Sequence, residues 1–192
     1  IDNSAGVDCS DNEVNIKIAL NAEMAAGRLQ IDVRNKLLAS MTDDVAALVL
    51  EDNRMQTLAL SIAESGGAGD LPAHVRLMET FEGQGRLDRA VEGLEGNDEY
   101  LRREADGHGL TRPELAVLLS TAKLVAQDAA EEGPLAADPA MDAELLAAFP
   151  RPMAEGHAQA ILSHRLRPQI IATKLANRMI NRMGMLHPFE LA

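Results

Sequence analysis

Apolar residues recur at helical spacing along nearly the whole chain, whereas the alternation typical of a half-buried strand is nearly absent after residue 10. Apolar residues make up 46% of the 192 positions, which is enough to fold around a substantial core. Aromatic residues make up only 2%, and nine Met accompany Leu, Ile, Val and Ala, a mixture that favours helices over strands. The sequence therefore predicts an all-α fold, an irregular bundle of about eight helices without a sheet of three or more strands.

One of two clear helix starts lies in the second half of the chain. Thr111 and Glu114 have the spacing of a capping box, and the apolar run that follows, Leu115–Ala130, predicts the core helix. We expect a break just before Pro168, because proline has no amide to donate, and a C-cap at Gly184. Other predicted helix starts, from polar residues that precede apolar periodicity, are Asp32, Thr42, Asp70, Asp88 and Asp98.

The first stretch of the chain combines a predicted turn with a second capping box. Asn3-Ser4-Ala5-Gly6 has the small and polar residues of a turn, and Ser10 is followed three residues later by Glu13. A helix from there to about Gly27 would present free amides and the positive end of its dipole, an arrangement that favours a carboxylate or phosphate. The same pattern also fits a plain capped helix without any ligand.

Charge and composition narrow the possible partners. A net charge of -12 argues against nucleic acid and anionic membranes, and no apolar run approaches the about 18 residues that a membrane span requires. The single cysteine, Cys9, fits a reducing cytoplasm, and we expect it to be a small buried side chain. His157 and His164 are seven residues apart but lack accompanying ligands, so we expect no metal site.

A complete nucleotide site is not expected in this sequence. The glycine-rich run Gly66-Gly67-Ala68-Gly69 follows a predicted helix and lacks the Gly-Lys-Ser/Thr ending of a phosphate-binding loop, so it is interpreted as a linker or hinge. No strand followed by Gly-x-Gly-x-x-Gly occurs, and no strong candidate for a catalytic lysine stands out. The chain opens at Ile1 within a patterned segment, and we interpret it as a fragment of something longer.

Both ends of the sequence resemble one enzyme family. The first segment resembles one that glutamate dehydrogenases share, in which Asn-Ala-Gly-Gly-Val is followed by Ser and Glu. The matching residues here, at the same spacing, are Asn3-Ser4-Ala5-Gly6-Val7, Ser10 and Glu13. Still closer is the large bacterial NAD-specific glutamate dehydrogenase family, to which segments farther along the chain are also similar: Leu110–Ala116, Arg165–Thr173, Leu175–Asn177 and Asn181–Gly184. Three departures are Asn12 where the family often has His, Ala5-Gly6 in place of the Gly-Gly of the smaller enzymes, and an unmatched tail from Met185.

The resemblance implies oxidation of L-glutamate to 2-oxoglutarate and ammonia, with hydride transfer to NAD. It places Asn3 near the nicotinamide ribose as a cofactor-binding residue. It also assigns Ser10 and the Val7 backbone to the pocket for the distal carboxylate of the substrate, and neither is a catalytic group. The catalytic lysine and most of the NAD site would belong to an upstream domain, so the isolated chain should be inactive.

The resemblance also implies a division of the chain. Residues 1–27 would be the end of an upstream α/β dinucleotide-binding catalytic domain, and residues 28–192 a C-terminal helical domain that supports catalysis or assembly. The expected partners are glutamate or 2-oxoglutarate, that upstream domain, and further copies in a cytoplasmic homo-oligomer. The alternative is a non-catalytic helical interaction or oligomerisation module, in which the first stretch is only a capped helix.

Overall fold

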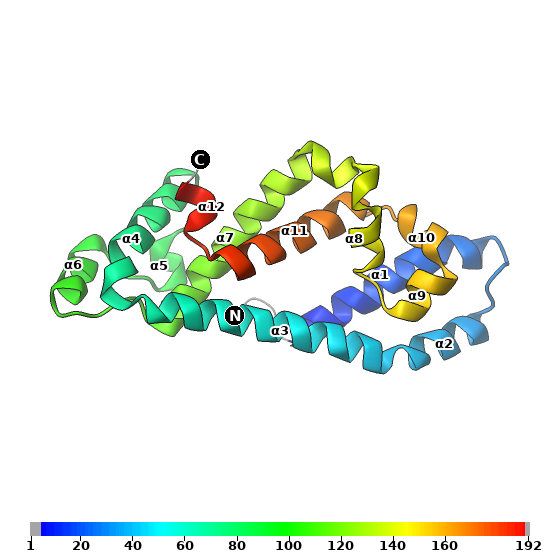
Figure 1. Cartoon of the computed structure of the whole chain (residues 1–192). Coiled ribbons are helices and arrows are strands. Elements are labelled where there is room, and N and C mark those ends of the chain that lie inside the picture. The colour runs from blue at the N-terminus through cyan, green and yellow to red at the C-terminus, as the bar shows by residue number, and fades with distance from the viewer. Residues whose placement is uncertain (1–4, 191–192) are drawn as a thin grey trace. The chain divides into compact units, whose positions relative to one another are not determined.

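The structure is a computed structural model that describes the backbone of residues 5–190 and the side chains of residues 9–189. Within this range every regular element is helical and no strand occurs, which confirms the predicted all-α fold (Figure 1). The helices are α1 (Ala5–Ala25), α2 (Ile31–Ser40), α3 (Thr42–Ser65), α4 (Gly67–Gly83), α5 (Arg89–Glu92), α6 (Asn97–Ala105), α7 (Arg112–Glu132), α8 (Asp142–Leu146), α9 (Arg151–Gly156), α10 (Ala158–Leu162), α11 (Arg167–Met183) and α12 (His187–Glu190), with two 3₁₀ helices, η1 (Pro134–Ala137) and η2 (Pro139–Met141). None of the described helices is long and apolar enough to cross a membrane.

Contacts within the chain group the described residues into two compact units. The first unit contains Met55–Asp128 and residues 176–190, and the second contains residues 5–54 and Ala129–Leu175. Each unit has its own cluster of buried apolar side chains, so each has a separate core. The predicted division into residues 1–27 and 28–192 remains a prediction about the longer protein.

The core of the first unit is built on α7, as the apolar run after Glu114 predicts. Buried side chains recur along this helix at a spacing of three to four residues, at Leu115, Leu118, Leu119, Ala122 and Ala126. They belong to the same cluster as the buried face of α4, which contributes Leu71, Leu77, Met78 and Phe81. The ring of Phe81 meets that of Phe189 edge-on, with centroids 5.1 Å apart.

The predicted capping box of α7 is confirmed for Glu114, which reaches back to the Thr111 amide, whereas the Thr111 hydroxyl donates to this carboxylate. α7 begins at Arg112, and the Glu114 carboxylate accepts hydrogen bonds from the Thr111 amide and the Thr111 hydroxyl, both at 2.7 Å. Arg103 donates two more bonds to the same carboxylate, at 2.9 and 2.8 Å. The Arg103 guanidinium also lies over the Tyr100 ring, 5.4 Å from its centroid. The cap of α7 is therefore also a buried ionic link to α6.

The glycine-rich run does not separate two elements as a linker would. α4 begins within it, at Gly67, three residues before the predicted start at Asp70. Gly67 adopts a φ of 56°, a conformation that glycine tolerates best. A Cβ on Gly109 would lie 2.5 Å from the Gly67 carbonyl oxygen, so the two backbones approach too closely for any side chain at position 109.

The core of the second unit combines α1 with the short helices α8–α10 and the start of α11. Ile16, Ala19 and Leu20 of α1 are buried in one cluster with Leu145, Phe149, Met153, Ile161 and Ile171. The expected break before Pro168 is confirmed, because α11 begins at Arg167 and places the proline in its first turn, where the missing amide costs nothing. A second interruption lies upstream, at His157 between α9 and α10.

Four of the other predicted starts, Asp32, Thr42, Asp88 and Asp98, lie within one residue of an observed helix start. Asp88 caps α5, accepting from the amides of Ala90 and Val91. The predictions for Asp32 and Thr42 are wrong as caps: α2 begins at Ile31, and the Thr42 hydroxyl donates to the Ala39 carbonyl at 3.0 Å instead of accepting from amides.

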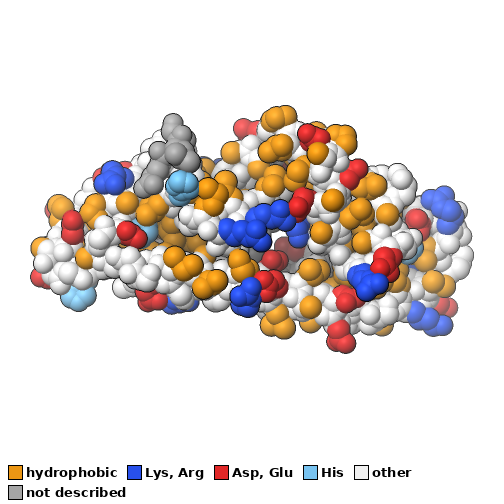
Figure 2. All heavy atoms as spheres, in the orientation of Figure 1, with side chains coloured by type: hydrophobic (Ala, Val, Ile, Leu, Met, Phe, Trp, Pro, Cys, Tyr) orange, Lys and Arg blue, Asp and Glu red, His pale blue; other side chains and the backbone are white. Residues whose placement is uncertain are grey.

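Hydrophobic side chains are scattered between charged ones on the face drawn in Figure 2. Large apolar residues with more than half of their surface exposed include Leu50, Ile62, Val91, Leu101 and Leu135. Scattered exposure of this kind is ordinary for a folded protein, so these residues alone do not define an interface.

Candidate functional site

The three residues that the sequence assigns to a ligand site lie at or near the start of α1. Asn3 lies outside the described residues. Val7 is in the first turn of the helix, where its backbone is described. Ser10 follows one turn later, with an exposed side chain.

The predicted capping box at Ser10 is wrong. α1 begins at Ala5, so Ser10 lies in its second turn and not at its N-cap, and Ala5 and Gly6 are helical instead of forming a turn. Glu13 forms an ion pair with Lys17, one turn farther on, and the hydrogen bond from Lys17 lowers the pKa of Glu13. The Glu13 carboxylate therefore has a partner on its C-terminal side, which explains why it does not accept a hydrogen bond from the Ser10 amide.

The helix start at Ala5 changes what this segment can bind. The first four amides of an α-helix have no acceptor inside the helix, and the Val7 amide is one of them here. Ser10 is three residues after Val7, so its hydroxyl projects from the same face of α1. The amides of a first helical turn, a hydroxyl and the positive end of the helix dipole together suit an anionic group such as a carboxylate.

The C-terminal half of α1 is held in place by its surroundings. Ile16 and Leu20 are buried, and the Glu23 carboxylate lies 3.0 Å from Nδ1 of His157. The Asn15 carbonyl accepts from Nε2 of His164 at 3.1 Å. The exposed turn at Ser10 therefore extends from a helix that is packed and hydrogen-bonded along its later turns.

A groove of about 340 Å³ runs beside this part of α1. The helix lines it with Cys9, Glu13 and Ile16, and α2 and α3 line it with Leu38, Ala39, Met41, Thr42, Val45 and Ala46. Cys9 is exposed, so its prediction as a buried residue is wrong. Ser10 is next to the groove in sequence but not part of its wall.

The two histidines considered for metal binding have structural partners instead. His157 faces Glu23, and His164 both donates to the Asn15 carbonyl and accepts at Nδ1 from the Leu166 amide, at 3.0 Å. These two roles require a neutral ring with its proton on Nε2. Among the described residues, no group of three or more His, Cys, Asp or Glu is placed to hold a metal ion.

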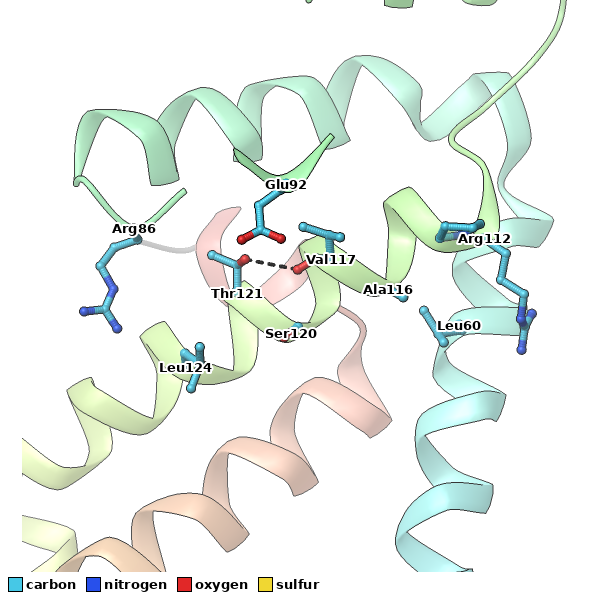
Figure 3. Close-up of a pocket in the computed structure, with 10 residues that line it drawn as sticks. Leu60, Arg86, Glu92, Arg112, Ala116, Val117, Ser120, Thr121 and Leu124 are labelled. Carbon is cyan, nitrogen blue, oxygen red and sulfur yellow. Dashed lines mark hydrogen bonds between the residues drawn. The ribbon is translucent and has the colours of Figure 1, made fainter. Parts of the chain in front are cut away.

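The first unit contains a larger cavity, of about 730 Å³, that the sequence did not predict (Figure 3). Its wall is formed mainly by one face of α7, with contributions from α3, α5 and the segment after α4: Leu60, Arg86, Glu92, Arg112, Pro113, Ala116, Val117, Ser120, Thr121 and Leu124. Figure 3 shows the side chain of Glu92 pointing toward Thr121, whose hydroxyl donates to the Val117 carbonyl at 3.0 Å. No local pattern could identify this cavity, because its walls come from separate segments.

Both arginines of this cavity are engaged by groups of the protein. Arg86 forms an ion pair with Asp128. Arg112 donates to Glu64 at 2.8 Å, to the Ser61 hydroxyl at 3.1 Å and to the Thr57 carbonyl at 3.2 Å. Because both guanidinium groups already have partners within the protein, their presence in the wall does not by itself indicate an anion site.

Comparison with known proteins gives consistent matches at both ends of the chain. The family of bacterial NAD-glutamate dehydrogenase catalytic domains matches residues 1–63, and the C-terminal family of glutamate dehydrogenases matches residues 107–192. No solved structure matches the chain significantly.

Curated relatives extend the similarity over the whole chain. The NAD-specific glutamate dehydrogenases of Pseudomonas aeruginosa, Halomonas elongata and Mycobacterium tuberculosis are 43%, 39% and 38% identical to it, over 96%, 97% and 100% of its length. The chain spans only 11–12% of the length of these relatives. With matches to both family models and to these relatives, the chain belongs to the family of NAD-specific glutamate dehydrogenases.

Proposed function

We propose that this chain is part of an NAD-dependent glutamate dehydrogenase, which converts L-glutamate and NAD to 2-oxoglutarate, ammonia and NADH. In this proposal, the start of α1 contributes to substrate binding, and the remaining helices form a C-terminal domain that supports the catalytic domain or its assembly. An upstream catalytic domain of the same protein supplies most of the NAD site and the catalytic lysine. The family and its NAD-specific relatives support this function.

The observation that carries the site proposal is the position of Ser10 relative to the first turn of α1. The Val7 amide is among the first four amides of α1, which have no acceptor within the helix, and the exposed Ser10 side chain lies one turn later. We propose that the two hold the distal carboxylate of glutamate and that Asn3 lies near the nicotinamide ribose. Because Ser10 lies in the second turn of α1 and is not its N-cap, its substitution should not remove a helix cap.

The test is Ser10→Ala in the full-length enzyme, with glutamate kinetics and melting temperature measured together. A lost hydrogen bond to a charged group costs roughly 1.5–3 kcal/mol, or about ten- to a hundredfold in kcat/KM. We expect this loss to appear mainly in KM, because the distal carboxylate does not react, while the melting temperature changes little. Ser10→Thr, which keeps the hydroxyl, should retain most of the activity.

Ser40→Ala is the matched control, because Ser40 is also an exposed helical serine of the second unit and its hydroxyl donates to the Leu37 carbonyl. It should leave kcat/KM unchanged. If Ser10→Ala also leaves kcat/KM within about twofold of the wild type, below the tenfold effect expected, Ser10 does not bind the substrate.

The same proposal predicts that the isolated 192-residue chain neither oxidises glutamate nor binds NAD measurably. The described residues contain no strand and therefore no strand–turn–helix site for a dinucleotide. Glutamate turnover by the purified chain would place the catalytic groups within it. The proposal that an upstream domain supplies them would then be wrong.

We also propose that the enzyme is a cytoplasmic homo-oligomer. The exposed free thiol of Cys9 fits a reducing compartment, and the homo-oligomer is what the resemblance to the family implies. Light scattering of the purified enzyme gives its mass, and a monomer at micromolar concentration would exclude the oligomer.

A further inference from the structure

The side chain of His164 connects the start of α11 to α1. His164 lies between α10 and α11 and is 5% exposed. Its Nδ1 atom accepts from the Leu166 amide at 3.0 Å, and its Nε2 atom donates to the Asn15 carbonyl at 3.1 Å. The centroid of the Phe149 ring lies 5.8 Å from that of the imidazole. Because the ring is buried and both of its nitrogens have partners, its orientation is fixed.

The Asn15 carbonyl lies where α1 leaves the core of the second unit. Ile16 and Leu20 are buried, whereas every side chain of residues 9–15 is at least partly exposed. α10, the helix directly before His164, packs against α1 within the same unit (Figure 1). The hydrogen bond from His164 therefore meets α1 at the boundary between its packed turns and its exposed turns.

This position makes the exposed turns sensitive to any tilt of α1. Ser10 is five residues before Asn15, which is about 7.5 Å along a helix that rises about 1.5 Å per residue. A tilt of about 8° at Asn15 would then move Ser10 by about 1 Å. A displacement of about 1 Å in a group that positions a substrate can cost about a hundredfold in rate.

We propose that His164 is a positioning residue that holds the start of α1, so that Ser10 and the Val7 amide meet the distal carboxylate of glutamate. This inference rests on the proposed function of the α1 site. His164 does not itself touch the substrate, because it is buried and both of its nitrogens are engaged within the protein. It acts through the Asn15 carbonyl, by resisting tilt and rotation of the exposed turns.

A second histidine contacts α1 at its other end and provides a matched control. Nδ1 of His157 lies 3.0 Å from the Glu23 carboxylate, in the last turn of α1. Ile16 and Leu20 lie between this contact and Ser10 and are packed in the core. They hold the helix there without His157, so His157→Gln should leave the exposed turns in place.

The experiment compares glutamate kinetics of two His164 variants of the full-length enzyme. His164→Met has a similar volume but makes neither hydrogen bond, so it should raise KM for glutamate by about tenfold while kcat and KM for NAD stay within about twofold. His164→Gln keeps an N–H donor for the Asn15 carbonyl and should restore most of the affinity. A merely structural role predicts a different result, in which less active protein lowers kcat and leaves KM unchanged.

A combination with Ser10→Ala tests whether His164 acts through the α1 site. The tenfold rise in KM caused by His164→Met should shrink to about threefold or less in a Ser10→Ala background, because the hydroxyl that His164 positions is absent. Equal rises in the two backgrounds would mean that His164 acts independently of Ser10, which contradicts the proposal.

Amide hydrogen exchange in the full-length enzyme gives a measurement that does not depend on catalysis. Exchange at residues 9–14 should be about fivefold faster in His164→Met than in the wild type, because one hydrogen bond fewer holds these turns. His164→Gln should restore the wild-type rate, and His157→Gln should not change it.

Three outcomes would overturn the proposal: an unchanged KM for glutamate in His164→Met, unchanged exchange at residues 9–14 in that variant, or an equal rise in KM in His157→Gln. Ser10→Ala alone reports on the proposed function. If Ser10→Ala raises KM for glutamate and His164→Met does not, only the positioning role is wrong. If neither variant changes KM, the substrate site is misassigned and the positioning role is wrong as well.

Discussion

Removing the Glu114 carboxylate should strongly destabilise the first unit. Glu114 is 8% exposed and accepts four hydrogen bonds of 2.9 Å or less, two from Arg103 and two from Thr111. Glu114→Ala leaves the Arg103 guanidinium without its closest partner and removes the cap of α7. Breaking a buried ion pair costs about 3–5 kcal/mol and losing a cap about 1 kcal/mol, and the two overlap in one carboxylate. The expected loss is therefore about 4 kcal/mol in the free energy of unfolding.

A less severe substitution separates the charge from the cap. Glu114→Gln keeps an oxygen that accepts from the Thr111 amide but loses the charge that attracts Arg103, so the expected loss is about 1.5–3 kcal/mol. The assay is urea unfolding at pH 7, followed by circular dichroism. Glu51→Gln is the control, because Glu51 pairs with Arg54 on the surface, where both side chains are more than half exposed. Its effect should stay below about 1 kcal/mol.

A double-mutant cycle with Arg103→Met tests the cause of the loss. If the ion pair dominates, the two single changes should be strongly non-additive, with a coupling energy of about 1 kcal/mol or more. Additive effects, or a Glu114→Gln variant as stable as the wild type, would refute the assignment of Glu114 as a buried link between α6 and α7.

Two further predictions concern pH and backbone packing. Burial lowers the pKa of His164, and likewise that of His74, so between the unfolded value of about 6.5 and the lower folded value the unfolded chain binds more protons. The free energy of unfolding should therefore be highest above about pH 6.5 and decrease as the pH falls below it, by up to about 1.4 kcal/mol per pH unit for each ring. Unfolding curves at a series of pH values should show a shallower decrease for His164→Gln than for the wild type. An identical decrease would contradict this assignment. Gly109→Ala should cost about 1–3 kcal/mol in the free energy of unfolding, because its Cβ would lie 2.5 Å from the backbone oxygen of Gly67. Gly69→Ala, inside α4 with no atom within 4 Å of the new Cβ, should instead stabilise by about 0.5–1 kcal/mol, and equal effects of the two changes would exclude the close approach.

Helix ends that depend on residues close together in the sequence could be predicted from the sequence. Thr111 and Glu114 form the expected cap because both partners lie within the first turn of α7. Pro168 interrupts a helix by its own covalent structure, and Gly184 ends α11 with a φ of 82°. Local chemistry decides each of these features, whatever the rest of the chain does.

The same kind of signal was misleading at Ser10. Its spacing to Glu13 is that of a capping box, but Lys17 offers the acid a charged partner one turn later, and the helix continues upstream to Ala5. The hydrogen bond between His164 and Asn15 could not be predicted at all, because these residues are far apart in sequence and only the folded unit brings them together. Sequence pattern thus located the helices, whereas the long-range partners required the structure.

The exposed thiol of Cys9 gives this segment an intrinsic chemical reporter. It is the only cysteine among the 192 residues, and it precedes Ser10 by one position on α1. Alkylation at Cys9 places a bulky group next to the proposed carboxylate site without any engineered residue. The rate of its modification then measures how open the start of α1 is, and a bound substrate that covers this turn would slow the reaction. Oxidation at the same sulfur would add a polar group there, so preparations of the protein require a reducing agent if the properties of α1 are to be compared.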